Sequence, residues 1–258
     1  MRKLTLIFLL VLIQYQAGNS QSIDTVSFVP ERPGMGTPPD IITSRSLDIE
    51  DGFQDTRQFN GNMRLDNLLF SSLLLRYGVG KIAEVRIQTD YVYNRETIDK
   101  KATSIFGLDP ITIGSKINLT GQRKVLPEIS ILFNLTLPFW GRKEFKPDHA
   151  APSVYLLMSN TISNTFNICY NYGVSWDGNS PVPTHFCSFC LGINLNRRWS
   201  TFIESYSYFH RQTNPQLYVD AGFACMLTNR LQVDFSAAGY LNAFTDFYLL
   251  NAGIAIKI

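Results

Sequence analysis

The sequence predicts an all-β protein: a single antiparallel transmembrane β-barrel of about 12 strands, preceded by a cleaved signal peptide. Three observations carry this prediction. Segments of about ten residues alternate apolar and polar side chains up to the last residue, a secretion signal opens the chain, and the connections between segments alternate in length. Short turns at one rim and long loops at the other are typical of outer-membrane barrels.

Residues 1–20 have the pattern of a signal peptide. Arg2 and Lys3 form a basic start, residues 4–13 are an apolar run interrupted only by Thr5, and small residues follow at 17–20, which places cleavage after Ser20. A run of this length is too short to span a bilayer as a helix. We therefore expect an exported protein whose mature chain begins at Gln21.

The final segment, residues 247–258, shows the alternation most clearly. Tyr248, Leu250 and Ile254 fall on one face, whereas Asn251 and Lys257 fall on the other. Side chains on a strand switch faces with period two, so one face of this strand is apolar and the other tolerates water. In a membrane barrel the apolar face meets lipid and the polar face lines the lumen.

The alternation and the turn residues place twelve strands in one barrel domain, residues 46–258. They lie near 46–55, 65–77, 81–93, 110–120, 127–138, 152–162, 165–176, 184–196, 198–209, 217–228, 230–241 and 247–258. Tight connections alternate with longer ones, which we expect at 94–109, 139–151, 177–183 and 211–216. An even number of strands brings both ends of the barrel to the rim with short turns, which faces the periplasm.

Residues 21–45 precede the barrel and contain four prolines, at positions 30, 33, 38 and 39. We expect an extended, turn-rich segment with two possible positions: a leader in the periplasm, or a partial plug inside the lumen. Chain ends of this composition are commonly poorly ordered, which favours the periplasmic leader. The segment is too short to form a globular plug domain.

Charged side chains on the strands must face the lumen, because an Arg or Lys that faces lipid near the midplane costs about 2–4 kcal/mol. The candidate lumen-lining residues are Glu50, Arg76, Glu84, Arg86, Lys116, Glu128, Glu204, Asp220 and Asp234, and Asp48, Asp66 and Asp90 share their parity. Two interpretations stay open: a polar conduit that orients a solute, or charges that pair to fill a small barrel. The acidic excess favours passage of cations or neutral solutes.

Four tyrosines, at positions 206, 208, 218 and 240, also have inward parity. They either stack on a ring-shaped solute or fill space in the lumen, and we favour the second interpretation.

Cys187 and Cys190 form a CxxC pattern, but positions three apart on a strand face opposite sides. Cys169 and Cys190, in contrast, lie nearly opposite across a hairpin, and we expect a disulfide between them if the compartment is oxidising.

The chain carries no catalytic or cofactor motif. His149, His185 and His210 are its only histidines, and Ser188 and Ser207 have the wrong strand parity to pair with a neighbouring histidine. Barrel lipid hydrolases need such a pair within hydrogen-bond reach. A net charge of +2 is too small to indicate a nucleic-acid-binding protein. We expect no enzymatic activity, no cofactor and no metal.

Several short stretches together resemble a known family. They are Glu31-Arg-Pro33, residues 74–78 (LLRYG), 113–117 (IGSKI), 126–129 (LPEI), 135–138 (LTLP) and 172–177 (YGVSWD). In order and spacing they are similar to bacterial outer-membrane barrels of the family called transporter, or putative meta-pathway of phenol degradation. The chain departs from the usual ending of such barrels, because it closes on Ile258 rather than on an aromatic residue.

The resemblance implies an outer-membrane barrel that takes part in the passage of small solutes, aromatic ones included. We therefore expect a monomeric barrel in the bacterial outer membrane that passes small, aromatic or hydrophobic solutes passively. Its expected partners are the lipid bilayer, the outer-membrane assembly machinery and the small-molecule solute. Two alternatives remain at this point. One is a structural or binding barrel that does not conduct, and the other is an outer-membrane enzyme that modifies lipid.

Overall fold

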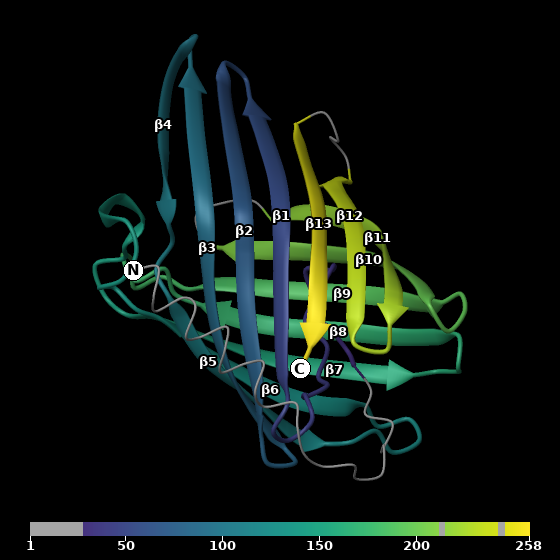
Figure 1. Ribbon diagram of the computed structural model, residues 1–258. Helices are drawn as coiled ribbons and strands as arrows, with labels where there is room; N and C mark the ends of the chain where they lie inside the picture. Colours follow the sequence, from purple (N-terminus) through teal and green to yellow (C-terminus); the bar gives the residue numbers. More distant parts are fainter. Residues whose placement is uncertain (1–27, 212–214, 242–245) are drawn as a thin grey trace, which may run out of the picture.

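The alternating segments form one antiparallel sheet that closes into a barrel (Figure 1). The computed structural model describes residues 28–211, 215–241 and 246–258. The strands are β1 (Leu47–Asn60), β2 (Met63–Val79), β3 (Ala83–Ile98), β4 (Lys101–Leu108), β5 (Thr112–Thr120), β6 (Glu128–Thr136), β7 (Ala151–Thr161), β8 (Phe166–Ser175), β9 (Thr184–Asn194), β10 (Trp199–His210), β11 (Gln216–Thr228), β12 (Leu231–Tyr240) and β13 (Phe247–Lys257).

Strand pairing closes the barrel between its first and last strands. β1 pairs antiparallel with β13, and Gly52 lies directly opposite Gly253 in that pair. β4 and β5 both pair with β3, β5 with its first half and β4 with its second half. Together they fill one position in the wall, so the 13 strands of the sheet occupy 12 positions. The predicted strand number is confirmed.

The loop predicted at residues 94–109 is wrong, because this region is a β-hairpin. β3 continues to Ile98, a two-residue turn follows, and β4 runs back along it. Asp99 and Lys100 both have positive φ, 46° and 69°, as the type I′ turns that join strands tightly require. The turn lacks the usual glycine, and each face of the hairpin mixes polar and apolar residues, so neither the turn residues nor the alternation predicted it.

The outer face of the barrel is apolar. On β13, Leu250 and Ile254 are exposed, whereas Asn251 and Ala255 are buried inside. This is the parity expected for a strand with one lipid face and one lumen face. No helix among the described residues has the length and apolar character needed to cross a membrane.

One rim carries turns of two to seven residues, at 80–82, 121–127, 162–165, 195–198 and 229–230, whereas every longer loop is at the other. We call the first of these the short-turn rim. Both ends of the barrel also lie there, because the Leu47 N–H donates to the Ile258 carbonyl at 3.1 Å. The opposite, long-loop rim carries the 3-10 helix Lys143–Phe145. The described part of the segment before β1, residues 28–45, runs inside the barrel (Figure 1).

Candidate functional site

The leader, residues 28–45, is hydrogen-bonded to strands on several sides of the lumen. The N–H groups of Met35 and Gly36 each donate to Glu204 on β10 at 2.8 Å. The Thr37 N–H donates to Asn171 on β8 at 2.8 Å. Backbone groups of a segment without secondary structure need such partners when they are buried. The signal peptide, residues 1–20, lies outside the described residues.

A buried ion network joins β1, β2 and β3 beneath the leader. Arg76 donates to both oxygens of Glu84, with its Nε and Nη2 at 3.0 and 2.9 Å, and its Nη1 donates to Glu50 at 3.0 Å. All three side chains are almost completely buried. A planar guanidinium that meets carboxylates through several nitrogens is the strongest kind of ion pair that side chains make.

Glu31 of the leader completes this network. Its carboxylate accepts from Arg86 Nη2 on β3 at 2.6 Å and from Lys116 Nζ on β5 at 2.7 Å, and its N–H donates to Glu50. Burial alone would raise the pKa of Glu31, but the charges of Arg86, Lys116 and Arg76 hold it well below the ordinary value. The ionised leader carboxylate is thus held by cations from three strands.

Arg32, the next residue, points to the other side of the seam between β1 and β13. Its Nη2 donates to Asn251 on β13 at 2.5 Å, and its Nε lies 3.3 Å from Asp234 on β12. A Cβ at Gly52 or at Gly253 would come 2.1 Å from the Arg32 side chain. The two glycines that face each other across the seam therefore leave the space that this side chain occupies.

The structure brings together most, though not all, of the predicted lumen residues. Glu50, Arg76, Glu84, Arg86 and Lys116 share one network, and Asp234 meets Arg32. Three lie apart from that network. Glu204 holds the leader and lies directly opposite the buried Asp220, and Glu128 is half-buried near the short-turn rim, where it accepts from Asn118 at 2.6 Å.

Sequence reasoning missed Glu31 and Arg32 as lumen residues. Parity cannot place them, because the leader is not a strand and its side chains have no fixed period. The only signal was the Glu31-Arg-Pro33 stretch itself. An acid and a base side by side, ahead of a barrel with unmatched inward charges, indicate a segment that can enter the lumen.

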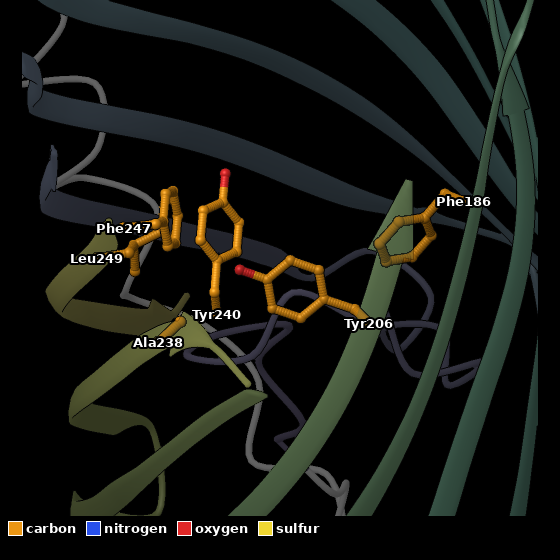
Figure 2. Close-up of a cluster of buried hydrophobic side chains, with 6 residues drawn as sticks. All are labelled: Phe186, Tyr206, Ala238, Tyr240, Phe247 and Leu249. Atoms are coloured by element: carbon orange, nitrogen blue, oxygen red, sulfur yellow. The ribbon is translucent and has the colours of Figure 1, made fainter. Parts of the chain in front are cut away.

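An aromatic cluster lies in the lumen toward the long-loop rim. Figure 2 shows Phe247, Tyr240, Tyr206 and Phe186 arranged across it. Tyr218 links them: its ring is parallel to that of Tyr206 at a centroid distance of 4.7 Å and lies 5.0 Å from that of Phe247. Met35 of the leader packs against the same cluster.

The leader lies between two cavities. One, of about 270 Å³, opens toward the long-loop rim and is lined by Tyr155, Phe186 and Tyr208. The other, of about 460 Å³, lies toward the short-turn rim and is lined by Cys169, Cys190 and other residues. Leader residues that include Glu31, Arg32 and Gly36 line both cavities. The leader thus divides the lumen, and it leaves space on each side.

The four cysteines are free thiols, so the disulfide expected between Cys169 and Cys190 is not formed in this structure. The register behind that expectation is present, because the two residues lie directly opposite each other on β8 and β9. The Cys169 Sγ instead points to the leader, 3.6 Å from the carbonyl oxygen of Thr37.

His185 and Ser188, a pair that the strand parity argued against, have separate partners. His185 is hydrogen-bonded to the Tyr172 hydroxyl at 2.8 Å and is half-buried, whereas Ser188 is buried and donates to Asn171. Within the described part of the chain, no three His, Cys, Asp or Glu side chains are arranged to hold a metal ion.

Comparison with known proteins gives a family and a fold. The family model described as Putative MetA-pathway of phenol degradation matches residues 31–258. No curated protein sequence matches the chain. An outer membrane channel from Pseudomonas putida F1 has a TM-score of 0.66 at 9% identity, over 93% of this chain and 100% of that one.

Two further solved structures share the fold. The KdgM porin, in complex with disordered oligogalacturonate, has a TM-score of 0.53 at 8% identity, over 82% of this chain and 98% of that one. The translocator domain of the autotransporter NalP from Neisseria meningitidis has a TM-score of 0.52 at 8% identity, over 83% and 88%. At these identities the likeness establishes a barrel of the outer-membrane type and nothing more specific.

Proposed function

Because the chain belongs to the family described as Putative MetA-pathway of phenol degradation, we propose that it is an outer-membrane channel for passive passage of small solutes, aromatic or hydrophobic ones included. The mature protein begins after a signal peptide at residues 1–20, is inserted by the outer-membrane assembly machinery and works as a monomer without a cofactor. We expect no enzymatic activity.

The observation that carries the proposal is the pair of cavities on either side of the leader. A barrel that served only as a structural element would gain stability from a filled interior, since empty space forfeits packing contacts. Here the strands leave space toward both rims, and residues 31–36 are the part of the described chain that lies between the two spaces. A path through the barrel needs only that this segment shifts.

The aromatic cluster supports an aromatic or hydrophobic solute. Tyr208 is partly exposed on the cavity that faces the long-loop rim, and Phe186 lines the same cavity. Ring faces bind other rings in offset or edge-on contacts, and such pairs contribute about 0.5–1.5 kcal/mol beyond their buried area. Several weak contacts of this kind concentrate a solute without trapping it, as passive passage requires.

Conductance of the refolded mature protein in a planar bilayer, with and without small phenolic solutes, tests the proposal. We expect discrete openings that a phenolic solute blocks in a concentration-dependent way. A matched variant that lacks residues 22–43 should give larger or longer openings, since the leader no longer divides the lumen.

The two alternatives give different results. A folded protein that stays silent, both with and without the leader, would contradict the channel and favour a structural or binding barrel. Release of fatty acid or any change in the surrounding lipid would instead identify a lipid-modifying enzyme, and thin-layer analysis of the bilayer lipids detects it in the same preparation.

A further inference from the structure

The turns of the short-turn rim carry basic side chains and no acidic ones. We take as this rim the five short turns together with residues 43–46, where the leader joins β1. These residues include seven basic side chains and no Asp or Glu: Arg45, Lys81, Arg123, Lys124, Arg197, Arg198 and Arg230. All seven are exposed.

The opposite rim has no such bias. Its connections, residues 61–62, 99–100, 137–150, 176–183, 211–215 and 241–246, contain five basic and five acidic residues. The bases are Lys100, Arg142, Lys143, Lys146 and Arg211, and the acids are Asp99, Glu144, Asp148, Asp177 and Asp246. Basic residues thus concentrate at one end of the molecule. The whole chain has almost as many acidic as basic residues, since its net charge is only +2.

The seven basic side chains have no acidic partner among the described residues. Within the part of the chain that the structure describes, none of them forms an ion pair, although Arg32, Arg76, Arg86 and Lys116 inside the barrel all do. Within the adjacent pairs Arg123/Lys124 and Arg197/Arg198, like charges without partners repel each other. An anionic partner outside the chain would relieve this repulsion.

Exposed apolar side chains stand directly beside the basic ones. Ile82 follows Lys81, Val125 and Leu126 follow Lys124, and Trp199 follows Arg198. Val125 is 88% exposed, so almost all of this apolar side chain is available for contact. A base next to an apolar or aromatic side chain is the pattern of a membrane interface, where the ring or alkyl group enters the acyl region and the charge meets the headgroups.

The bases also surround the barrel rather than forming one patch. They come from the turns β2–β3, β5–β6, β9–β10 and β11–β12 and from the leader exit beside β1. A folded protein partner contacts one face of a rim, whereas a lipid leaflet touches the outside of every turn. The distribution therefore favours lipid over an acidic protein.

We propose that the short-turn rim binds anionic phospholipid headgroups, with guanidinium and ammonium groups on the phosphates and the neighbouring apolar residues among the first acyl carbons. Arginine is suited to this because its planar fork matches phosphate oxygens. The inference rests on the proposed location of the barrel in a membrane. It adds a lipid selectivity at one rim that the channel function by itself does not require.

Trp199 gives a local reporter, because it lies next to Arg197 and Arg198 and the other two tryptophans, Trp140 and Trp176, lie at the long-loop rim. A W140F/W176F protein is refolded into phosphatidylcholine vesicles that contain a fixed fraction of brominated phosphatidylglycerol or, in parallel, brominated phosphatidylcholine. Bromine quenches Trp199 fluorescence on contact. We expect stronger quenching by the anionic lipid at equal fraction, and a decline of this preference at high salt.

The matched variants are R197Q/R198Q at the short-turn rim and R142Q/K143Q at the long-loop rim, both in the same background. The first removes two charges worth about 1 kcal/mol each and should lower the apparent affinity for the anionic lipid about 30-fold, and the second should leave it unchanged. Equal quenching by the two lipids, or equal effects of the two variants, would overturn the proposal.

A separate readout keeps the two proposals distinguishable. Insertion into pure phosphatidylcholine vesicles is followed by the shift of the folded band on unheated gels and by protection of the barrel from trypsin. A protein that inserts but shows no lipid preference contradicts only the headgroup site. A protein that does not insert in either lipid contradicts the membrane channel, and the headgroup site with it.

Discussion

The Arg32 side chain lies directly over Gly253, so that a Cβ at position 253 would come 2.1 Å from its Nε. Gly253 belongs to the last strand and faces Gly52 of the first. Arg32 thus covers the seam at which the barrel closes. With Glu31 held by β3 and β5, and Arg32 held by β12 and β13, two consecutive leader residues connect the two sides of that seam.

Substituting Gly253 should therefore displace the leader at this point. In G253V the new side chain needs the space of the guanidinium, which must leave Asp234, a carboxylate with no exposed surface. Removing the partner of a buried charge costs about 3–5 kcal/mol. We expect a lower midpoint for urea unfolding in lipid and faster proteolysis of the leader. G121A is the control, because a Cβ there meets nothing within 4 Å, and an equal loss in both variants would contradict this role.

Arg76 should be the side chain whose removal destabilises the barrel most. R76M leaves Glu50 and Glu84 buried without their main cation, and it also removes a charge near Glu31. We expect a loss of about 3–5 kcal/mol in the free energy of unfolding. R57M, at a pair whose arginine is about one-third exposed, should lose less than about 1 kcal/mol. Similar losses in the two variants would argue against the network.

Anchoring of the leader should weaken in acid. The folded protein holds the pKa of Glu31 well below its ordinary value of 4.5, so the stabilisation is complete above pH 4.5 and is lost as the pH falls through the depressed value. We expect conductance to rise in that acidic range. In E31Q it should already be raised at neutral pH, and the acidic rise should be smaller. An unchanged pH profile in E31Q would assign the response to other groups.

Tyr208 should contribute to binding of an aromatic solute. Y208A removes a ring that lines the cavity facing the long-loop rim and that lies 5.2 Å from Phe186. If one ring contact provides about 0.5–1.5 kcal/mol, block of the channel by a phenolic solute should become about 2–10-fold weaker. Y91A, which removes an exposed ring next to Phe70 on the outer face, should leave block unchanged. Equal block in Y208A and the parent would exclude this contact.

Mild oxidation should join Cys169 to Cys190. The two residues are direct cross-strand partners on β8 and β9, which is the arrangement that a cross-strand disulfide needs. With added disulfide oxidant, we expect the intact mass to fall by two hydrogens, and peptide mapping should recover the joined peptides. C187S/C225S should behave like the parent, and C190S should show no change in mass. If the thiols of Cys169 and Cys190 still react with a thiol reagent after oxidation, this disulfide prediction is wrong.

The sequence by itself determined which charged strand side chains face inward and how many positions the wall has. Arg76, Lys116 and Asp234 could be assigned inward because a strand has a strict period of two and lipid excludes charge, so local pattern and environment leave a single choice. The hairpin between their strands placed Cys169 opposite Cys190. For the inward direction of each side chain no neighbouring strand had to be known, because the alternation is a property of each strand alone.

The tertiary structure alone decided what fills the lumen. Glu31 and Arg32 lie in a segment without a repeating conformation, and their partners come from strands whose residues are as many as 219 positions away. The aromatic cluster likewise gathers residues from β9 to β13. Such contacts exist only after the barrel closes, because closure of the sheet brings its first and last strands together around a common interior.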